Sequence, residues 1–324
     1  MSPKKVAIII LNWNGLQDTL ECLTSLQQLR YRYFKIFLAD NGSTDHSLSK
    51  IGALFPDVHL IDNKENLGFA EGNNRAILVA LEQNFDCILL LNNDTTVDPH
   101  LLDAFLNLHA LYPTHILGAQ VHLFARRDLL DHLGGLWNSK KAAFDLIGYR
   151  EQASLYASSI ELDYVTGCCL FASKEVFHQV GFLDPRFFLY WEESDFCQRG
   201  KRLGIFCRSC PEAHIYHKVS ASFVGGKPHA QYFFWRNRFL FTEKNLAKKE
   251  QFFIWLTIFS PEILKMARHY LLVQLQLFFA LCLRKNSVEK KRQHLLLIQA
   301  SLCGVKDYLL RRFYQGPSWI FKKN

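Results

Sequence analysis

Residues 87–94, CILLLNND, combine an apolar run of strand length with side chains that could bind a cation. The apolar part shows no polar alternation, so it predicts a strand buried on both faces of a mostly parallel sheet. Ligands of such sheets bind beyond the carboxyl ends of the strands. Asn92, Asn93 and Asp94 would stand there with a carboxylate and amide oxygens, the hard ligand atoms that Mg²⁺ or Mn²⁺ accepts. The alternative is a polar turn that leads into a helix near Asp98 and Pro99.

Similar polar clusters follow three earlier apolar runs. In chain order, these clusters are Asn12-Trp13-Asn14-Gly15 after residues 6–11, Asp40 to Asp45 after residues 34–39, and Asn66 to Asn74 after residues 58–61. One polar residue at a strand end is ordinary, but the carboxyl ends of parallel strands meet at one edge of a sheet. The number of clusters therefore favours a binding site over a set of unrelated turns.

The elements that carry these clusters alternate between strand and helix patterns. Leucines at helical spacing follow residues 12–15, and apolar residues at the same spacing follow the second and third clusters. This alternation predicts right-handed βαβ units and a doubly wound sheet. Two nucleotide-binding classes are excluded, because the chain has neither GxGxxG nor GxxxxGK followed by Ser or Thr. Residues 101–111 predict a helix and residues 116–123 and 165–173 predict strands, whereas residues 126–156 show no clear pattern.

The most acidic motif is WEESDFCQR, residues 191–199, at the start of a predicted helix. A carboxylate beside apolar surface can act as a general base, because burial raises its proton affinity. Acidic residues also stabilise helix N-termini through the helix dipole. Glu192, Glu193 and Asp195 are therefore all candidates for the base, and each has a purely structural alternative.

Taken together, seven stretches resemble the family 2 glycosyltransferases of the GT-A fold, especially bacterial rhamnosyltransferase-like members. They are IIILNWNG, DNGSTD, NLGFAEGNN, LLLNND, VTGCCLFASKEVF, GFLDPRFFLYWEESDFCQR and HKVSAS, and they span residues 6–222 in the family's order. The resemblance implies an α/β GT-A domain with a doubly wound, mostly parallel sheet flanked by helices. It also implies inverting transfer of a sugar from a nucleotide-diphosphate donor, a UDP- or dTDP-sugar such as dTDP-rhamnose. The implied acceptor is a hydroxyl of a cell-surface polysaccharide or of a lipid-linked saccharide.

The resemblance further implies roles for residues of the donor site. Asp40 would accept a hydrogen bond from the imide N–H of uracil or thymine, in a pocket that Asn12 and Asn14 line; this acceptor disfavours bases without that donor. A glycine-containing loop would bring backbone and a helix N-terminus to the diphosphate. The residues implied for this loop are Asn66, Gly68, Asn73 and Asn74.

The resemblance also implies a metal site and a base. Asp94 occupies the last position of the family's Asp-x-Asp motif, whose first position is Asn92 here, and Asp94 would bind Mg²⁺ or Mn²⁺ together with His217. Glu193 occupies the second position of the family's Glu-Asp motif and would be the base that accepts the acceptor's proton. Because Glu replaces Asp there, Glu192 and Asp195 remain alternatives.

Charge divides the chain at about residue 223. Residues 1–223 carry 20 basic and 25 acidic groups, a net charge of −5, whereas residues 224–324 carry 18 and 5, a net charge of +13. Apolar blocks at residues 252–259 and 270–283 are shorter than the ~20 residues of a spanning helix, and basic residues flank them. These features predict a C-terminal helical region that binds an anionic membrane surface rather than nucleic acid. A helical lid or an oligomer contact is the alternative.

Cysteine usage and the N-terminal sequence bear on the compartment. The nine cysteines are odd in number and lack framework spacing, and no signal peptide precedes the first strand, which favours a reducing cytosol. Cys207 and Cys210 form a single CxxC without a second pair, so structural thiols are preferred over a zinc site. We therefore expect a GT-A catalytic domain in residues 1–223 and a membrane-associating region in residues 224–324, peripheral on the inner face of the cell membrane.

Two other functions fit parts of the pattern. The substitutions at Asn92 and Glu193 would suit a non-catalytic homologue that binds nucleotide sugars. A nucleotidyltransferase could share the sheet and the metal, but its triphosphate site needs cationic groups near the first loop, and residues 12–15 supply none.

Overall fold

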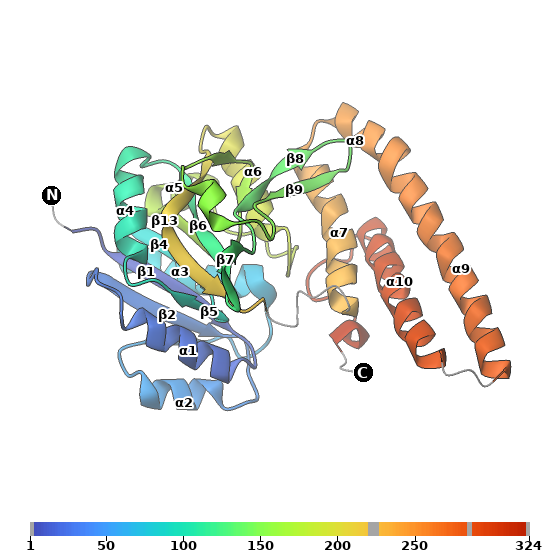
Figure 1. Cartoon of the computed structure of the whole chain (residues 1–324), viewed down its shortest axis with the longest axis horizontal. Coiled ribbons are helices and arrows are strands. Elements are labelled where there is room, and N and C mark those ends of the chain that lie inside the picture. The colour runs from blue at the N-terminus through green and yellow to red at the C-terminus, as the bar shows by residue number, and fades with distance from the viewer. Residues whose placement is uncertain (1–2, 220–226, 284–286, 322–324) are drawn as a thin grey trace. The chain divides into compact units, whose positions relative to one another are not determined.

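A computed structural model describes residues 3–219, 227–283 and 287–321. Residues 220–222, the end of the HKVSAS stretch, and the basic pair Arg284 and Lys285 lie outside these ranges. The chain divides into two compact units, whose elements Figure 1 labels. The first contains Met1–Trp137, Phe144–Phe188 and Glu192–Ser220, and the second contains Asn138–Ala143, Leu189–Trp191 and Ala221–Asn324.

The first unit is built on a mixed sheet with helices on both faces. The strands of the described chain are β1 (Val6–Asn12), β2 (Phe34–Asp40), β3 (His59–Asp62), β4 (Cys87–Asn92), β5 (Thr95–Val97), β6 (Ile116–Leu123), β7 (Arg126–Leu130), β8 (Gly134–Asn138), β9 (Ala143–Ile147), β10 (Glu161–Leu162), β11 (Tyr164–Val165), β12 (Cys169–Ser173) and β13 (Cys207–His217). The helices of this unit are α1 (Leu16–Leu26), α2 (Ser47–Leu54), α3 (Gly68–Glu82), α4 (Leu101–Leu111), α5 (Lys174–Val180), α6 (Glu192–Arg202) and the 3₁₀ turn η1 (Ala153–Tyr156).

The large sheet has the strand order β10-β13-β6-β12-β4-β1-β2-β3. Strands β3, β2, β1 and β4 are parallel, β12 is antiparallel to its neighbours β4 and β6, and β13 is parallel to β6. A smaller sheet has the order β11-β8-β9. The expected architecture, a doubly wound and mostly parallel sheet between helices, is confirmed.

The central strands are buried on both faces, as their unbroken apolar composition predicts. In β4, Ile88 and Leu90 face the core under α3, α5 and α6, whereas Leu89 and Leu91 face the core under α1, α2 and α4. Cys207 and Cys210 are buried free thiols on β13, in keeping with the structural interpretation of the CxxC.

The strand register brings the polar clusters to one edge of the sheet. Asn12 is opposite Asp40, Asp40 is opposite Asp62, and Asn92 is opposite Leu11. Asn12, Asp40, Asp62 and Asn92 are the last residues of four parallel strands, so the side chains that follow β1, β2, β3 and β4 emerge at the same rim. The convergence expected from the sequence is thus a consequence of the register.

Helix α3 is longer than its apolar pattern suggests. The spacing of residues 76–81 predicts a helix, and Gly68 to Asn74 reads as a loop, but the helix already begins at Gly68. Glycine and asparagine have low helix propensity, and tertiary packing overrides it here. A Cβ on Gly72 would lie 2.6 Å from Leu11 Cδ1, so only glycine lets this helix lie close to β1.

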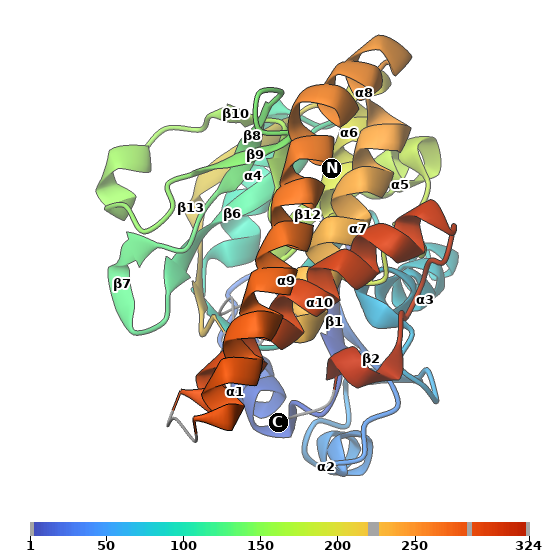
Figure 2. The same ribbon diagram turned by 90° about the vertical axis from the view of Figure 1, so that its right-hand side faces the viewer.

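The second unit is helical. It contains α7 (Pro228–Asn245), α8 (Lys248–Ile254), the π-helical turn η2 (Trp255–Phe259), α9 (Ser260–Cys282), α10 (Val288–Leu309) and the 3₁₀ turn η3 (Ser318–Phe321). Figure 2 shows the long helices α7, α9 and α10 together, and α10 packs against both α7 and α9. Phe239 of α7 lies in its core, 4.4 Å from Phe259 and 5.2 Å from Tyr308 between ring centroids.

The arginines of α7 stabilise this unit from within. Arg238 is buried, donates to the carbonyl oxygens of Lys141 and Ala142, and forms a 2.8 Å ion pair with Glu262. A buried guanidinium with several acceptors holds segments that are distant in sequence.

The first apolar block, residues 252–259, lies in the end of α8 and in η2, whereas α9 contains the polar residues between the blocks and most of the second block. Among the described residues of α9, only Val273 and Ala280 are buried. No helix of the described ranges is both long enough and apolar enough to cross a membrane.

Candidate active site

The nucleotide side of the site is organised by Asn12 and Asp40, which face each other across β1 and β2. Asn12 Nδ2 donates to Asp40 Oδ1 at 2.7 Å and to Ser43 Oγ at 3.1 Å. Asp40 Oδ2 accepts the backbone N–H of Ser43 at 2.8 Å. Asp40 is only 2% exposed, so these contacts keep a nearly buried carboxylate satisfied. Each oxygen of the Asp40 carboxylate has a second lone pair, so each can accept one further hydrogen bond.

Asn14 shapes the mouth of this pocket. Its backbone is left-handed, with φ of 52°, a conformation that asparagine tolerates better than most residues. The side-chain oxygen of Asn14 accepts a hydrogen bond from the backbone N–H of Thr44 at 2.7 Å. The backbone N–H of Asn14 donates to Ser43 Oγ at 2.8 Å. Asn14 therefore ties the loop after β1 to the loop after β2.

Asn93 also belongs to this network. Its Nδ2 donates to Thr19 Oγ1 at 2.9 Å and to Asn12 Oδ1 at 3.3 Å. Sequence reasoning noted Asn93 at the strand end but did not include it among the donor-site residues. Asn92, which was included, makes contacts through its backbone: its carbonyl accepts Thr95 Oγ1 at 2.7 Å.

Four residues were expected at the diphosphate. The side chains of three of them, all asparagines, form hydrogen bonds with backbone groups of the protein. Asn66 Oδ1 accepts the N–H of Gly68 at 2.9 Å, and Asn73 Nδ2 donates to the carbonyl of Phe69 at 2.9 Å. Asn74 exchanges two hydrogen bonds with the backbone of Leu183, at 2.8 and 3.1 Å. Direct contact of these amides with a ligand stays a prediction.

Gly68 is required for a different reason. Its φ is +77°, and a Cβ there would collide with the carbonyl oxygen and the ring of Phe188. The next residue, Phe69, donates its N–H to that same carbonyl at 2.6 Å. The start of α3 is thereby fixed against the segment that precedes the acidic helix α6.

The proposed metal ligands meet because β5 pairs with β13. Thr95 is opposite His217 in that antiparallel pair, so Asp94, one residue earlier, lies beside the end of β13. The two buried side chains approach closely, with 3.3 Å between Asp94 Oδ1 and His217 Nε2. Sequence reasoning paired these two residues, and the structure brings them together.

A second carboxylate, Asp131, contacts the same imidazole. Its Oδ2 lies 2.9 Å from His217 Nδ1, and its Oδ1 lies 3.7 Å from His132 Nδ1. Burial alone would raise the pKa of Asp131, but the nearby His132 and the hydrogen bond with His217 outweigh it and hold that pKa well below its usual range. Burial alone would lower the pKa of His217, but Cys168 and the carboxylates of Asp131 and Asp94 hold it well above its usual range. Asp131 and His132 lie in the region whose shape the sequence did not reveal.

The side chains present fit a divalent cation whose coordination shell is completed by oxygen atoms of a bound ligand. Within the described residues, no group of three or more His, Cys, Asp and Glu side chains is arranged to hold a metal ion. Asp94 and His217 supply a carboxylate oxygen and an imidazole nitrogen side by side, at the edge where the nucleotide is expected. Mg²⁺ is usually bound through one or two carboxylates plus substrate phosphates, so two protein ligands suffice.

Glu193 has the environment of a general base. It is partly buried at the start of α6, and its Cβ and Cγ face Gly167. Burial raises the pKa of Glu193, although its own backbone N–H and the nearby His132 offset part of the rise. Its charge also contributes to the raised pKa of the buried Tyr164. A carboxylate with raised proton affinity is suited to accept a hydroxyl proton.

The neighbouring acids differ in their surroundings. Asp195 is completely buried and forms a 2.9 Å ion pair with Arg199, one helical turn later. Arg199 also donates to the carbonyl oxygens of Val180 and Phe182, so this pair anchors the loop after α5. Glu192 is 3% exposed. Glu193 is close enough to His132 for that residue to lower its pKa, which connects it to the part of the site that contains Asp131 and His217.

Solved structures share this fold at low sequence identity. The mannosyltransferase PcManGT from Pyrobaculum calidifontis, in complex with GDP-Man and Mn²⁺, aligns with a TM-score of 0.56 at 13% identity, covering 96% of this chain and 89% of that one. S. aureus TarS 1–349 in complex with UDP-GlcNAc aligns with a TM-score of 0.53 at 13% identity, covering 96% and 93%. GalNAc-T7 with UDP, GalNAc and Mn²⁺ aligns with a TM-score of 0.56, but the match spans only 55% of that chain. The fold is therefore that of the GT-A glycosyltransferases.

The family follows from the sequence match. The model of glycosyl transferase family 2 matches residues 7–181, more than half of the chain. The chain belongs to this family and is a glycosyltransferase, as the motif resemblance implied.

Relatives of known activity include two rhamnosyltransferases. The dTDP-rhamnosyl transferase RfbF of Shigella flexneri is 24% identical over 307 residues, which cover 92% of this chain and 94% of the relative. The N-acetylglucosaminyl-diphospho-decaprenol L-rhamnosyltransferase of Mycobacterium tuberculosis (strain ATCC 25618 / H37Rv) is 26% identical over 223 residues, which cover 62% and 71%. The resemblance to rhamnosyltransferase-like members is thus confirmed.

Proposed function

We propose that the protein transfers rhamnose or a related sugar, with inversion, from a dTDP- or UDP-sugar to a hydroxyl of a lipid-linked saccharide or cell-surface polysaccharide. The observation that carries this proposal is the approach of Asp94 to His217 at the same rim that holds Asn12 and Asp40. Rhamnose is proposed because the two relatives named above are rhamnosyltransferases.

On the donor side, each group has a defined task. The spare lone pairs of Asp40 would accept the imide N–H of thymine or uracil, and Asn12 and Ser43 keep that carboxylate in place. Asp94 and His217 would hold Mg²⁺ or Mn²⁺, which when bound neutralises charge that develops on the diphosphate leaving group. Gly68 lets the start of α3 lie against Phe188, and the N-terminus of this helix would favour the negatively charged diphosphate.

On the acceptor side, Glu193 would take the proton. The acceptor oxygen forms a bond to the anomeric carbon while the bond between that carbon and the diphosphate oxygen breaks. The hydroxyl proton moves to the Glu193 carboxylate, and the nucleoside diphosphate leaves with the bonding electrons. Attack on the face opposite to the leaving group inverts the anomeric centre.

Donor turnover in purified protein tests this function. Protein incubated with dTDP-rhamnose, other dTDP- and UDP-sugars, and Mn²⁺ or Mg²⁺ should release nucleoside diphosphate when a saccharide acceptor is added. Thermal stabilisation by one donor without turnover would instead indicate the non-catalytic homologue. Release of pyrophosphate from a nucleoside triphosphate and a sugar phosphate would indicate the nucleotidyltransferase.

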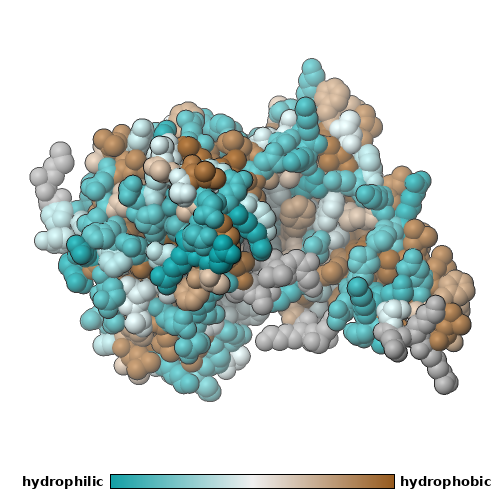
Figure 3. Space-filling model, in the orientation of Figure 1, coloured by the Kyte–Doolittle hydropathy of each residue, from teal (hydrophilic) through white to brown (hydrophobic). Residues whose placement is uncertain are grey.

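We further propose that α9 docks on an anionic membrane surface, peripheral on the inner face of the cell membrane. Leu264, Arg268, Leu271, Leu275 and Phe278 follow one another at intervals of three or four, so they share one face of the helix, and all are exposed. Figure 3 shows apolar residues, in brown, along the lower part of α9, with polar residues between them. An apolar face with interspersed cations suits the boundary between head groups and acyl chains.

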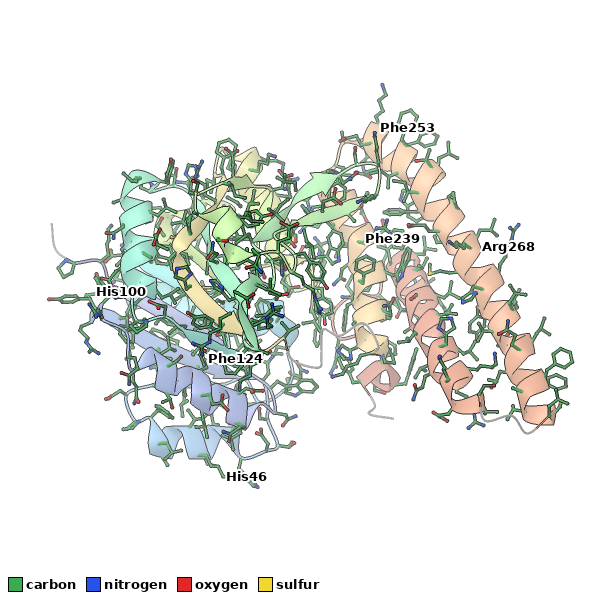
Figure 4. The ribbon with its side chains drawn as sticks, viewed as in Figure 1. His46, His100, Phe124, Phe239, Phe253 and Arg268 are labelled. Atoms are coloured by element: carbon green, nitrogen blue, oxygen red, sulfur yellow. The ribbon has the colours of Figure 1, made fainter. Side chains whose placement is uncertain are left out.

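The upper half of α9 adds cations to that face. Pro261, Leu264, Lys265, Arg268, His269 and Leu272 line an open pocket of about 400 Å³. Figure 4 shows Arg268 on the outer side of α9, and Phe253 at the end of α8. A lipid phosphate with its glycerol carbons would match cations placed beside leucines. A second copy of this chain is the alternative occupant, and the net charge of +13 in residues 224–324 argues against pairing like surfaces.

A further inference from the structure

Asp131 is the least expected member of the site, because no motif led to it. It follows β7 directly, and its backbone N–H donates to the carbonyl of Val121 at 2.7 Å. The preceding residue, Leu130, is tied to the carbonyl of Glu151 at 2.9 Å, so the backbone on this side is fixed to two different segments. The side chain is 6% exposed and reaches His217 at 2.9 Å.

We infer that Asp131 is a positioning residue that sets which nitrogen of His217 is offered to a cation. This inference rests on the proposed function, in which Asp94 and His217 hold the metal. An ionised carboxylate can only accept, so the 2.9 Å contact places a proton on Nδ1 of His217. Nε2 is then the nitrogen that faces Asp94, 3.3 Å from its Oδ1, and a cation that binds there displaces the Nε2 proton and uses the lone pair.

Without that carboxylate, Asp94 is the carboxylate left on the ring, and it favours a proton on Nε2, the nitrogen that the cation needs. Histidines that bind metal usually donate their other ring N–H to a carboxylate or carbonyl, and loss of that partner typically weakens metal affinity about 10- to 100-fold. In this arrangement Asp94 supplies the ligand oxygen and His217 the ligand nitrogen. Asp131 is the carboxylate that orients the His217 ring. A simple structural ion pair would require only one of the two carboxylates on the ring.

The test compares Asp131→Asn with a matched structural carboxylate. Asp163→Asn is the control: Asp163 accepts the N–H of Trp137 at 2.7 Å and pairs with Lys201 at 2.5 Å, and it belongs to neither proposed ligand set. Mn²⁺ is titrated into each protein, alone and with UDP or dTDP, and free Mn²⁺ is read by electron paramagnetic resonance. We expect Asp131→Asn to weaken Mn²⁺ binding about 10- to 100-fold, and Asp163→Asn to leave it within twofold while lowering the melting temperature.

A spectroscopic readout separates positioning from folding. Electron spin echo modulation should show ¹⁴N coupling of an imidazole to bound Mn²⁺ in the wild type, no such coupling in His217→Gln, and weaker or altered coupling in Asp131→Asn. If Asp131→Asn keeps wild-type affinity and coupling, the inference is wrong, whatever its melting temperature. If His217→Gln also keeps wild-type affinity, the proposed metal site itself fails, so the two failures are distinguishable.

Discussion

Asn12 donates a 2.7 Å hydrogen bond to Asp40 across two neighbouring parallel strands, and both residues are almost completely buried. The register of β1 and β2 makes them direct neighbours, and the backbone N–H of Ser43 donates a hydrogen bond to the second carboxylate oxygen of Asp40. An amide and a carboxylate thus hold each other at the rim where the nucleotide is expected. Fixed acceptors discriminate strongly between ligands, because a ligand that lacks the matching donor leaves them unpaired.

The first prediction concerns base recognition by Asp40. Asp40→Asn keeps the shape of the side chain but replaces one acceptor oxygen with an N–H₂ group, which cannot accept the imide N–H of uracil or thymine. We expect affinity for UDP and dTDP to fall about 10- to 100-fold, the loss typical of one unmade hydrogen bond to a charged group. Isothermal titration calorimetry measures this directly.

The matched control is Asp62→Asn at the end of the adjacent strand. Asp62 is opposite Asp40 in the register of β2 and β3, but its partner is the exposed Lys64. We expect nucleotide affinity within twofold of wild type in this variant. Equal losses in both variants would contradict a specific role for Asp40.

Much of this rim could be predicted from the sequence, because each signal is local. An apolar run that ends in Asn or Asp reads as a buried strand with a polar carboxyl end, and this pattern occurs in β1, β2 and β4. The register then follows from parallel pairing. Asp94 and His217 were implied as a pair of metal ligands by the resemblance to family 2 glycosyltransferases rather than by these local patterns.

Asp131 and His132 could not be found in this way, because their contacts depend on tertiary structure. They lie between the short strands β7 and β8, in a stretch without apolar periodicity, and they reach the site because β7 pairs with β6. The start of α3 escaped prediction for a related reason: Gly72 weakens helix propensity locally, and its close contact with Leu11 is visible only in the packed sheet.

The second prediction separates the base from its acidic neighbour. Glu193→Gln keeps size and removes proton affinity, so kcat should fall at least ~10²-fold while donor binding is retained. Asp195→Asn breaks the buried pair with Arg199 and should instead cost about 3 kcal/mol of unfolding free energy. Single-turnover rates and denaturant titrations give the two readouts. Near-normal turnover in Glu193→Gln would move the role to Glu192 or Asp195.

The third prediction is a pH dependence with a definite sign. Burial raises the pKa of Glu193, and the base must be deprotonated, so activity should fall on the acid side at a higher pH than for an ordinary glutamate. His132 opposes part of that rise, so His132→Asn should raise the pKa of Glu193 further and move the acid limb of kcat to higher pH. Profiles of kcat between pH 5 and 8 decide this; an unchanged limb in His132→Asn would exclude the coupling. Asp163→Asn, outside the site, should leave the profile unmoved.

The fourth prediction concerns metal dependence. Asp94→Ala and His217→Ala each remove one proposed ligand, so each should weaken donor binding in the presence of Mn²⁺ and leave metal-free binding of the nucleotide nearly unchanged. The charge on the diphosphate is then less well neutralised. Calorimetry with and without Mn²⁺ gives the comparison, and full transfer activity of the wild type in EDTA would rule metal dependence out.

The last prediction concerns the exposed face of α9. Deleting the chain from Phe252 onward would uncover buried residues, because Phe259 and Tyr308 pack on Phe239, so point substitutions are the cleaner test. Leu271, Leu275 and Phe278 are 59%, 57% and 60% exposed on one helix face. Changing all three to Ser removes apolar insertion without touching the core. We expect this variant to sediment far less with anionic vesicles than the wild type does.

Three exposed leucines of the first unit provide the control: Leu54, Leu111 and Leu203, at 62%, 73% and 56% exposure. Their triple Ser variant loses similar apolar surface away from α9 and should still bind vesicles. Each cation near an anionic surface contributes about 1 kcal/mol, so salt should weaken wild-type binding in part and leave the apolar contribution. Transfer to a lipid-linked acceptor should slow in the α9 variant, while donor hydrolysis should not. If the wild type stays in the supernatant at every anionic content, and its mass in solution is that of a dimer, the face of α9 joins two copies of this chain instead.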